Sequence, residues 1–228
     1  MVWQDCGLTR HELDDSHQFY SGKLPAELLF DQSSFEALWQ LHPDEFHDIT
    51  IYGRQVKTPR WQQAFGADYY YTGNLNRALP IPDLMRGLYD WCRQTIHGEL
   101  NAILLNWYDA EFRHYIGKHR DSTVNMLVGS PIVTISLGAT RTFRLRPWQS
   151  KRERLEKSGS QSEAAFIDFP AEDGTIFVTP YETNLAWTHE VPHSARCEGR
   201  RISFTLRAFT TGVLDDSSQP STQQKTQE

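Results

Sequence analysis

Residues 131–146 read PIVTISLGATRTFRLR, and this stretch decides the fold class. Apolar and β-branched residues recur with a period of two on both sides of Gly138-Ala139-Thr140, a segment with the composition of a turn. The pattern predicts one strand over 131–138 and a second over 141–146. Because the connection is so short, we expect antiparallel pairing.

The same period of two extends to both sides of this stretch, from Asn101 to Phe209. A second turn signal lies at 170–174. Further strands are predicted at 101–108, 113–119, 165–169, 175–179 and 201–209.

Two helices are predicted before the strands, around 33–41 and 83–97. In the second, Asp83 can cap the start and Gly98 the end, and the apolar residues at near-helical spacing are Leu84, Leu88, Trp91 and Ile96. Short strands behind a helical N-terminal third predict an α+β, mainly β fold. We expect a β-sandwich or jelly roll braced by N-terminal helices.

The composition is that of a single soluble domain of 228 residues, 39% hydrophobic and 23% charged. No apolar stretch approaches the roughly 20 residues that span a bilayer, and the N-terminus has no secretory pattern. Three cysteines without a CxxC pair predict free thiols in a reducing compartment. We therefore expect a cytoplasmic or nuclear monomer without a membrane segment.

Charge is unevenly distributed along the chain. The first 50 residues carry ten acidic and two basic side chains, whereas residues 113–157 carry ten basic and three acidic ones. The basic segment is compatible with docking of a polyanion, and equally with a solvated basic hairpin. The formal net charge of −6 argues against strong non-specific binding of nucleic acid.

The candidate metal ligands start with His119 and Asp121 in the sequence GKHRD. In an extended segment, residues i and i+2 point to the same side, so their side chains can converge on one ion. His189 or His193 can supply a third ligand. Two histidines and one carboxylate form the facial triad of non-haem Fe(II) oxygenases. The alternative is a surface histidine beside an acid.

Residues 201–207 read RISFTLR, and their alternation as a strand places Arg201, Ser203, Thr205 and Arg207 on one face. Such arginines are ordinarily exposed to solvent. Beside an iron site they could instead bind a dicarboxylate, because guanidinium forms bidentate hydrogen bonds with carboxylates.

Over roughly residues 50–209 the sequence resembles the AlkB family of Fe(II)/2-oxoglutarate dioxygenases. The matching pieces, in order, are Asn106-Trp107-Tyr108, His119-Arg120-Asp121, GSPI at 129–132 leading to SLG at 136–138, WTHEVP at 187–192, and the arginine strand 201–207.

This resemblance implies a double-stranded β-helix with Fe(II), 2-oxoglutarate and O2 as cofactors. His119, Asp121 and His189 would hold the iron. Arg201 would bind the distal carboxylate of 2-oxoglutarate, with Arg207 near its proximal end. Asn106, Tyr108 and Ser203 would assist, although Ser203 stands where the family has Asn.

The substrates implied are N-alkylated bases in DNA or RNA, extruded into a pocket. Residues 58–73 resemble the family's nucleotide-recognition lid, and Tyr71 occupies the position of a base-stacking aromatic residue. The residues assigned to the substrate are Tyr71, Trp61, Tyr69 and Arg120. Their alternative role is packing on the sheet. Ser122-Thr123-Val124 depart from the acidic residue that repair members usually carry after the iron-binding Asp.

The domains expected are an acidic N-terminal extension with a short helix at 1–50, an AlkB-like dioxygenase domain at 51–210 and a disordered tail at 211–228. The function expected is oxidative demethylation of N-alkylated bases, as in DNA repair. Two alternatives remain: the same iron centre could hydroxylate a small molecule or a protein side chain, or the fold could be a binding module without turnover.

Overall fold

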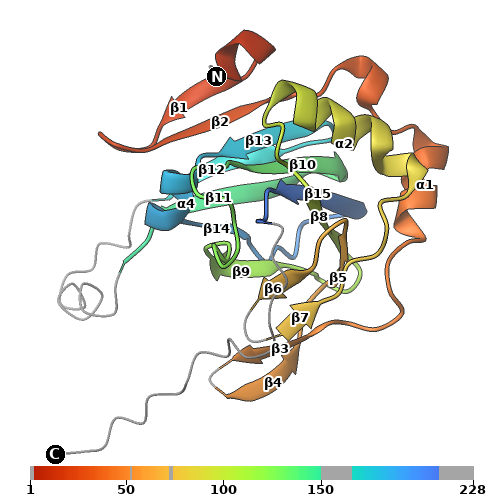
Figure 1. Cartoon of the computed structure of the whole chain (residues 1–228). Helices are drawn as coiled ribbons and strands as arrows, with labels where there is room; N and C mark the ends of the chain where they lie inside the picture. Colours follow the sequence, from red (N-terminus) through yellow and green to blue (C-terminus); the bar gives the residue numbers. More distant parts are fainter. Residues whose placement is uncertain (1–2, 52, 72–73, 150–165, 211–228) are drawn as a thin grey trace, which may run out of the picture.

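Two antiparallel sheets face each other and enclose the centre of the protein (Figure 1). The structure is a computed structural model that describes residues 3–51, 53–71, 74–149 and 166–210. Aromatic side chains from both sheets, among them Phe143 and Phe177, pack between them. This architecture is a jelly roll, so the predicted fold class is confirmed.

The larger sheet has seven strands, and each adjacent pair in it is antiparallel. Its order across the sheet is β1 (Thr9–Glu12), β2 (Gln18–Lys23), β13 (Thr175–Thr179), β10 (Ile132–Gly138), β15 (Arg200–Arg207), β8 (Ala102–Asp109) and β5 (Trp61–Phe65).

The smaller sheet has four antiparallel strands, and two hairpins lie outside both sheets. Its order is β12 (Ile167–Ala171), β11 (Arg141–Pro147), β14 (Trp187–Val191) and β9 (Ile116–His119). The hairpins are β3 (Asp48–Ile51) with β4 (Arg54–Lys57), and β6 (Tyr69–Tyr71) with β7 (Asn74–Asn76).

The two strands of the 131–146 stretch exist as predicted, but they do not pair with each other. β10 pairs with β13 and β15 in the larger sheet, whereas β11 pairs with β12 and β14 in the smaller one. Gly138 has a φ of +82°, and a Cβ there would lie 2.5 Å from the carbonyl oxygen of Arg200. The expected hairpin turn is therefore a corner at which the chain passes from one sheet to the other.

The helices α1 (Gln32–Trp39) and α2 (Asp83–Thr95) lie over the outer face of the larger sheet (Figure 1). Asp31 caps α1 by accepting a hydrogen bond from the Ser34 amide. In α2 the residues buried against the sheet include Met85, Leu88 and Cys92. Leu84, predicted for the buried face, is exposed, and Asp83 is the first helical residue rather than the cap.

The N-terminal third was predicted to be helical, but strands β1 to β7 lie in it together with 3-10 turns at Trp3–Cys6 and Ala26–Leu28. β1, with the sequence TRHE, has no apolar alternation, and it forms by pairing with β2 at the edge of the larger sheet. Such short polar strands depend on their neighbours, which is why the hydrophobic period did not indicate them.

The three cysteines, Cys6, Cys92 and Cys197, are free thiols, as predicted. In the described part of the chain, no helix has the length and apolar character to cross a membrane. The predicted disordered tail at 211–228 lies outside the described residues.

Candidate active site

A pocket opens between the two sheets, and it contains most of the side chains that the sequence singled out. Its empty volume is about 500 Å³, a figure that includes space open to solvent. The predicted residues that line it are Asn106, Tyr108, His119, Asp121, His189, Arg201, Ser203, Arg207 and Tyr69.

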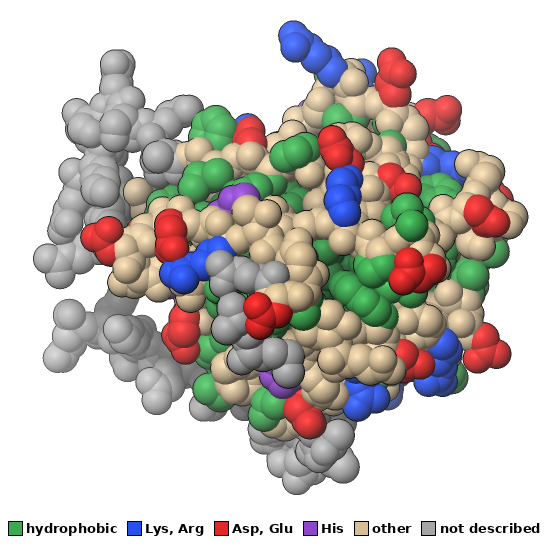
Figure 2. Space-filling model, turned by 90° about the horizontal axis from the view of Figure 1, so that it is seen from above, with side chains coloured by type: hydrophobic (Ala, Val, Ile, Leu, Met, Phe, Trp, Pro, Cys, Tyr) green, Lys and Arg blue, Asp and Glu red, His purple; other side chains and the backbone are tan. Residues whose placement is uncertain are grey.

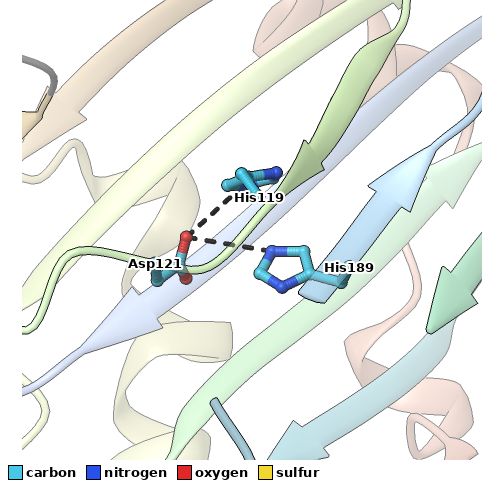
Figure 3. Close-up of side chains that lie close together, drawn as sticks. All are labelled: His119, Asp121 and His189. Atoms are coloured by element: carbon cyan, nitrogen blue, oxygen red, sulfur yellow. Dashed lines mark ion pairs between the residues drawn. The ribbon is translucent and has the colours of Figure 1, made fainter. Parts of the chain in front are cut away.

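His119, Asp121 and His189 converge on one point (Figure 3). His119 ends β9 and lies directly opposite His189 of β14, so strand pairing alone brings the two imidazoles together, with ring centres 4.3 Å apart. Asp121 follows on the same side of the chain as His119. His193, the other candidate for the third ligand, is exposed and contacts the ring of Tyr115 instead.

The atoms of this cluster are spaced as ligands of one ion would be. Oδ1 of Asp121 lies 3.6 Å from Nε2 of His119 and 3.8 Å from Nε2 of His189, and the three ligand atoms lie within 4.8 Å of one another. The Nδ1–H of His119 donates to the carbonyl oxygen of Gly117 at 2.8 Å, which leaves Nε2 with its lone pair toward the cluster. The donor set fits Fe(II) with open positions for further ligands.

Arg207 holds the other oxygen of the Asp121 carboxylate. Its Nε and Nη2 donate to Oδ2 at 3.1 and 2.5 Å, so Oδ1 remains for the histidines. Burial alone would raise the pKa of Asp121, but the positive charge of Arg207 holds it well below its usual value. Burial, aided by the neighbouring His119, lowers the pKa of His189 to about 3. At neutral pH the cluster therefore holds one carboxylate and a neutral His189.

Arg201 carries a buried positive charge at the other end of the pocket. Its Nε donates to Oγ of Ser136 at 2.8 Å, whereas Nη1 and Nη2 have no hydrogen-bond partner among the described residues. Its guanidinium carbon lies 5.0 Å from the centre of the Tyr108 ring. Burial lowers the pKa of Arg201 to about 10, so the group remains charged at neutral pH. Two unsatisfied buried donors are a ready-made site for a carboxylate, so the pocket fits 2-oxoglutarate.

Asn106 and Ser203 are cross-strand neighbours on β8 and β15, and both line the pocket. The side-chain oxygen of Asn106 accepts a hydrogen bond from Nε of Arg60 at 2.7 Å. Arg60 is buried in the pocket wall. No sequence pattern indicates this position, because an arginine in a predicted lid is normally expected at the surface.

The residues predicted to contact a substrate separate into three groups. Tyr69 lines the pocket, and the centre of its ring lies 4.7 Å from the guanidinium carbon of Arg207. Tyr71 lies in β6, but its side chain is outside the described part of the structure. Trp61 and Arg120 are not brought to the pocket.

Strand alternation explains both exceptions. Along β5, Gln62 lines the pocket, so Trp61 faces the opposite side. There its ring stacks on the ring of His42, with the ring centres 4.3 Å apart. Arg120 lies between His119 and Asp121 and therefore points away from them. Its Nη1 donates to the carbonyl oxygen of Leu185 at 2.6 Å, and its guanidinium lies over the ring of Trp148.

Three arginines in the described part of the basic segment 113–157 make contacts within the protein. Arg141 is buried, and its Nη2 donates to the carbonyl oxygen of His114. Arg144 and Arg146 pair with Asp168 and Glu190. The face seen from above in Figure 2 carries side chains of both signs, scattered among hydrophobic and polar ones on its described part. For these three arginines, the contacts favour a role within the fold over docking of a polyanion.

Asp121 is the only carboxylate among the described residues that line the pocket. Ser122 and Thr123, which follow it, offer hydroxyl groups where an acid was expected. A cationic methylated base would thus meet no second carboxylate in this part of the site.

Comparisons with known proteins found one matching family and several similar proteins. The family described as the 2OG-Fe(II) oxygenase superfamily matches residues 39–207. The DNA oxidative demethylase ALKBH2 of Homo sapiens is 26% identical over 198 residues, which cover 86% of this chain and 73% of that protein. The Alpha-ketoglutarate-dependent dioxygenase alkB homolog 3 of Homo sapiens is 24% identical over 185 residues, 80% of this chain and 61% of that protein. The solved structure of OsALKBH1 matches with a TM-score of 0.49 at 14% identity, over 87% of this chain and 99% of that one.

Proposed function

Because this chain belongs to the 2OG-Fe(II) oxygenase superfamily, and is therefore a 2-oxoglutarate-dependent Fe(II) dioxygenase, we propose that it oxidatively demethylates N-alkylated bases in DNA or RNA. Its cofactors are Fe(II), 2-oxoglutarate and O2. The observation that carries the proposal is the His119, Asp121 and His189 cluster in one pocket with the unpartnered guanidinium of Arg201.

In this proposal the two histidines and Asp121 hold the iron, and the pocket holds the cosubstrate beside it. When bound, iron and 2-oxoglutarate together supply the chemistry by which O2 hydroxylates a nearby C–H bond. Arg207 keeps Asp121 ionised and turned toward the metal position. Hydroxylation of an N-methyl group releases the methyl carbon as formaldehyde.

Arg201 anchors the distal carboxylate of 2-oxoglutarate through Nη1 and Nη2. A carboxylate there would satisfy two buried donors that otherwise cost stability. Asn106, Ser203 and Tyr108 also line the pocket, where they can donate hydrogen bonds to bound 2-oxoglutarate.

The choice of substrate has independent support in the relatives, since the ALKBH2 proteins that resemble this chain are named as DNA oxidative demethylases. The pocket also has an aromatic wall at Tyr69, next to Leu104. An extruded base stacked on an aromatic ring gains about 1–3 kcal/mol. We infer further that Tyr71 contributes to this stacking.

The proposal is tested with iron-loaded protein, 2-oxoglutarate and a panel of methylated single- and double-stranded oligonucleotides that includes cationic and neutral lesions. Mass spectrometry should show loss of one methyl group and release of formaldehyde. The variant His119→Ala should abolish the loss, and Lys118→Ala, at an exposed position of the same strand, should not. If 2-oxoglutarate is consumed but no oligonucleotide is demethylated, the substrate is instead a small molecule or a protein side chain.

We also infer that the protein acts as a monomer in the cytoplasm or nucleus. The three free thiols support a reducing compartment. Light scattering of the purified chain and imaging of a tagged chain test the two statements.

A further inference from the structure

The carboxylate ligand Asp121 lies beyond the end of its strand. β9 ends at His119, so no strand pairing fixes the backbone of Asp121. A metal site requires its ligands to be held within a few tenths of an ångström. Arg207 holds the carboxylate, so another contact must position the backbone.

The side chain of Asn184 makes that contact. Asn184 lies in the short helix α4 (Tyr181–Ala186) and is buried. Its Oδ1 accepts a hydrogen bond from the Asp121 amide at 3.0 Å, and its Nδ2 donates to the Asp121 carbonyl oxygen at 3.1 Å. An Asn amide offers one acceptor and donors on adjacent atoms, so it pairs with a backbone as a neighbouring strand would.

A third hydrogen bond joins the same two segments. Nη1 of Arg120 donates to the carbonyl oxygen of Leu185 in the last turn of α4. That carbonyl is one of those that a helix end leaves without a partner, and a cation there is favourable. The segment from Arg120 to Asp121 is thus held to α4 by three hydrogen bonds.

The helix is itself anchored to the larger sheet. Oγ1 of Thr183 donates to the carbonyl oxygen of Gln18 in β2 at 2.7 Å. At its C-terminal end α4 continues directly into β14, the strand that carries His189. One short rigid element therefore connects the backbone of Asp121 with the strand of His189.

We propose that α4 is the positioning element of the metal centre, and that Asn184 is the positioning residue that sets Asp121 relative to His189. This inference rests on the proposed iron site. Asn184 itself contacts neither iron nor substrate, and it acts through Asp121.

The test is titration of the metal-free protein with Co²⁺, whose visible absorption reports its ligands. Asn184→Leu should weaken the affinity about 10- to 100-fold, the usual cost of removing an outer partner of a ligand. Excess metal should restore 2-oxoglutarate consumption. Leu185→Ala is the matched control, since this neighbouring side chain is exposed and its carbonyl is retained. It should bind Co²⁺ as the unsubstituted protein does.

If folded Asn184→Leu, checked by circular dichroism, binds Co²⁺ with the unsubstituted affinity and spectrum, the inference is wrong. Should that variant not fold, Arg120→Met is measured instead, because this side chain is partly exposed. Its loss removes the third hydrogen bond and the contact with the Trp148 ring, and it leaves both hydrogen bonds of Asn184 in place. It should weaken the affinity by a smaller factor, and an unchanged affinity overturns the inference. Failure of the unsubstituted protein to bind Co²⁺ through His119 and His189 would instead contradict the proposed iron site.

Discussion

Arg201 is buried with only 1% of its surface exposed, and two of its three guanidinium nitrogens lack a partner among the described residues. Such a group is costly in the free protein and is compensated when a carboxylate binds. Under the proposal that Arg201 binds 2-oxoglutarate, the carboxylate of that molecule would satisfy these nitrogens.

We predict that Arg201→Lys raises the dissociation constant for 2-oxoglutarate roughly 10- to 100-fold, because lysine keeps the charge but cannot form the bidentate pair. Hydrogen bonds to charged groups contribute about 1.5–3 kcal/mol, which corresponds to that range. Isothermal titration with metal-loaded protein measures it. Arg200→Gln is the control, since Arg200 pairs with Glu36 and does not line the pocket. An unchanged constant in Arg201→Lys would show that the cosubstrate binds elsewhere.

At the scale of single residues the sequence predicted the site well where alternation applies. The spacing of His119 and Asp121, and of Arg201 and Arg207, placed each pair on one face, and the structure brings all four to the same pocket. Alternation also predicts that Arg120, between His119 and Asp121, points away from that pocket. Its assignment to the substrate did not take this into account. Arg60 and Asn184 were missed because one polar residue in a lid or a short helix has no periodic pattern.

Among the elements, the corner at Gly138 determines which sheet each of its flanking strands joins. We predict that Gly138→Ala destabilises the protein by at least about 1–2 kcal/mol, because an L-residue is strained at positive φ and its Cβ would meet the Arg200 carbonyl. Urea unfolding measures the change.

The matched control for this prediction is Gly87→Ala in α2, where no neighbouring atom lies within 4 Å of the added Cβ. Alanine in a helix interior should stabilise the protein by about 0.5–1 kcal/mol. Equal effects of the two substitutions would contradict the role of the corner.

The β1–β2 connection is tied to β14 through Asp14, whose carboxylate accepts a hydrogen bond from the Trp187 indole at 2.9 Å. Its slight burial works to raise the pKa of Asp14, but hydrogen bonds from Ser16, Trp187 and His17 lower it to about 2. Since this pKa is depressed from 3.8, the stabilisation is present above about pH 4 and is lost as the pH falls toward 2.

We therefore predict that Asp14→Asn melts below the unsubstituted protein at neutral pH and that the difference shrinks between pH 4 and 2. The Asp14 side chain is largely exposed, so the loss of stability should stay below about 1 kcal/mol. This corresponds to a fall in Tm of at most ~2–4 °C. Thermal unfolding followed by circular dichroism checks it. A difference that does not change with pH would assign the effect to packing rather than to charge.

At the scale of elements, all seven strands predicted from residue 101 onward are present. Most of them bury at least one face, which their hydrophobic pattern shows, whereas β9 has no buried residue. β14 and α4 were not predicted. WTHEV mixes polar and apolar residues within five positions, and α4 is too short for a helical period to appear. The element that carries His189 was thus identified by motif and not by pattern.

For the whole molecule, composition predicted one β-rich domain, but it did not show that the N-terminal segment completes the larger sheet. Phe19 of β2 is fully buried between the sheets, stacked against Phe143 at 5.8 Å. The domain boundary expected at residue 50 remains a prediction. Residues 9–23 contribute β1 and β2, the two strands at the end of the larger sheet opposite β5.

The outermost strand on that side is β1, and its side chains Arg10 and Glu12 are exposed and form an ion pair. An open strand edge is where a foreign β-segment would add, and charges along it oppose such growth. The terminal hairpin therefore ends the larger sheet with a surface that discourages edge-to-edge aggregation, so the extension shields β13 from cross-β assembly.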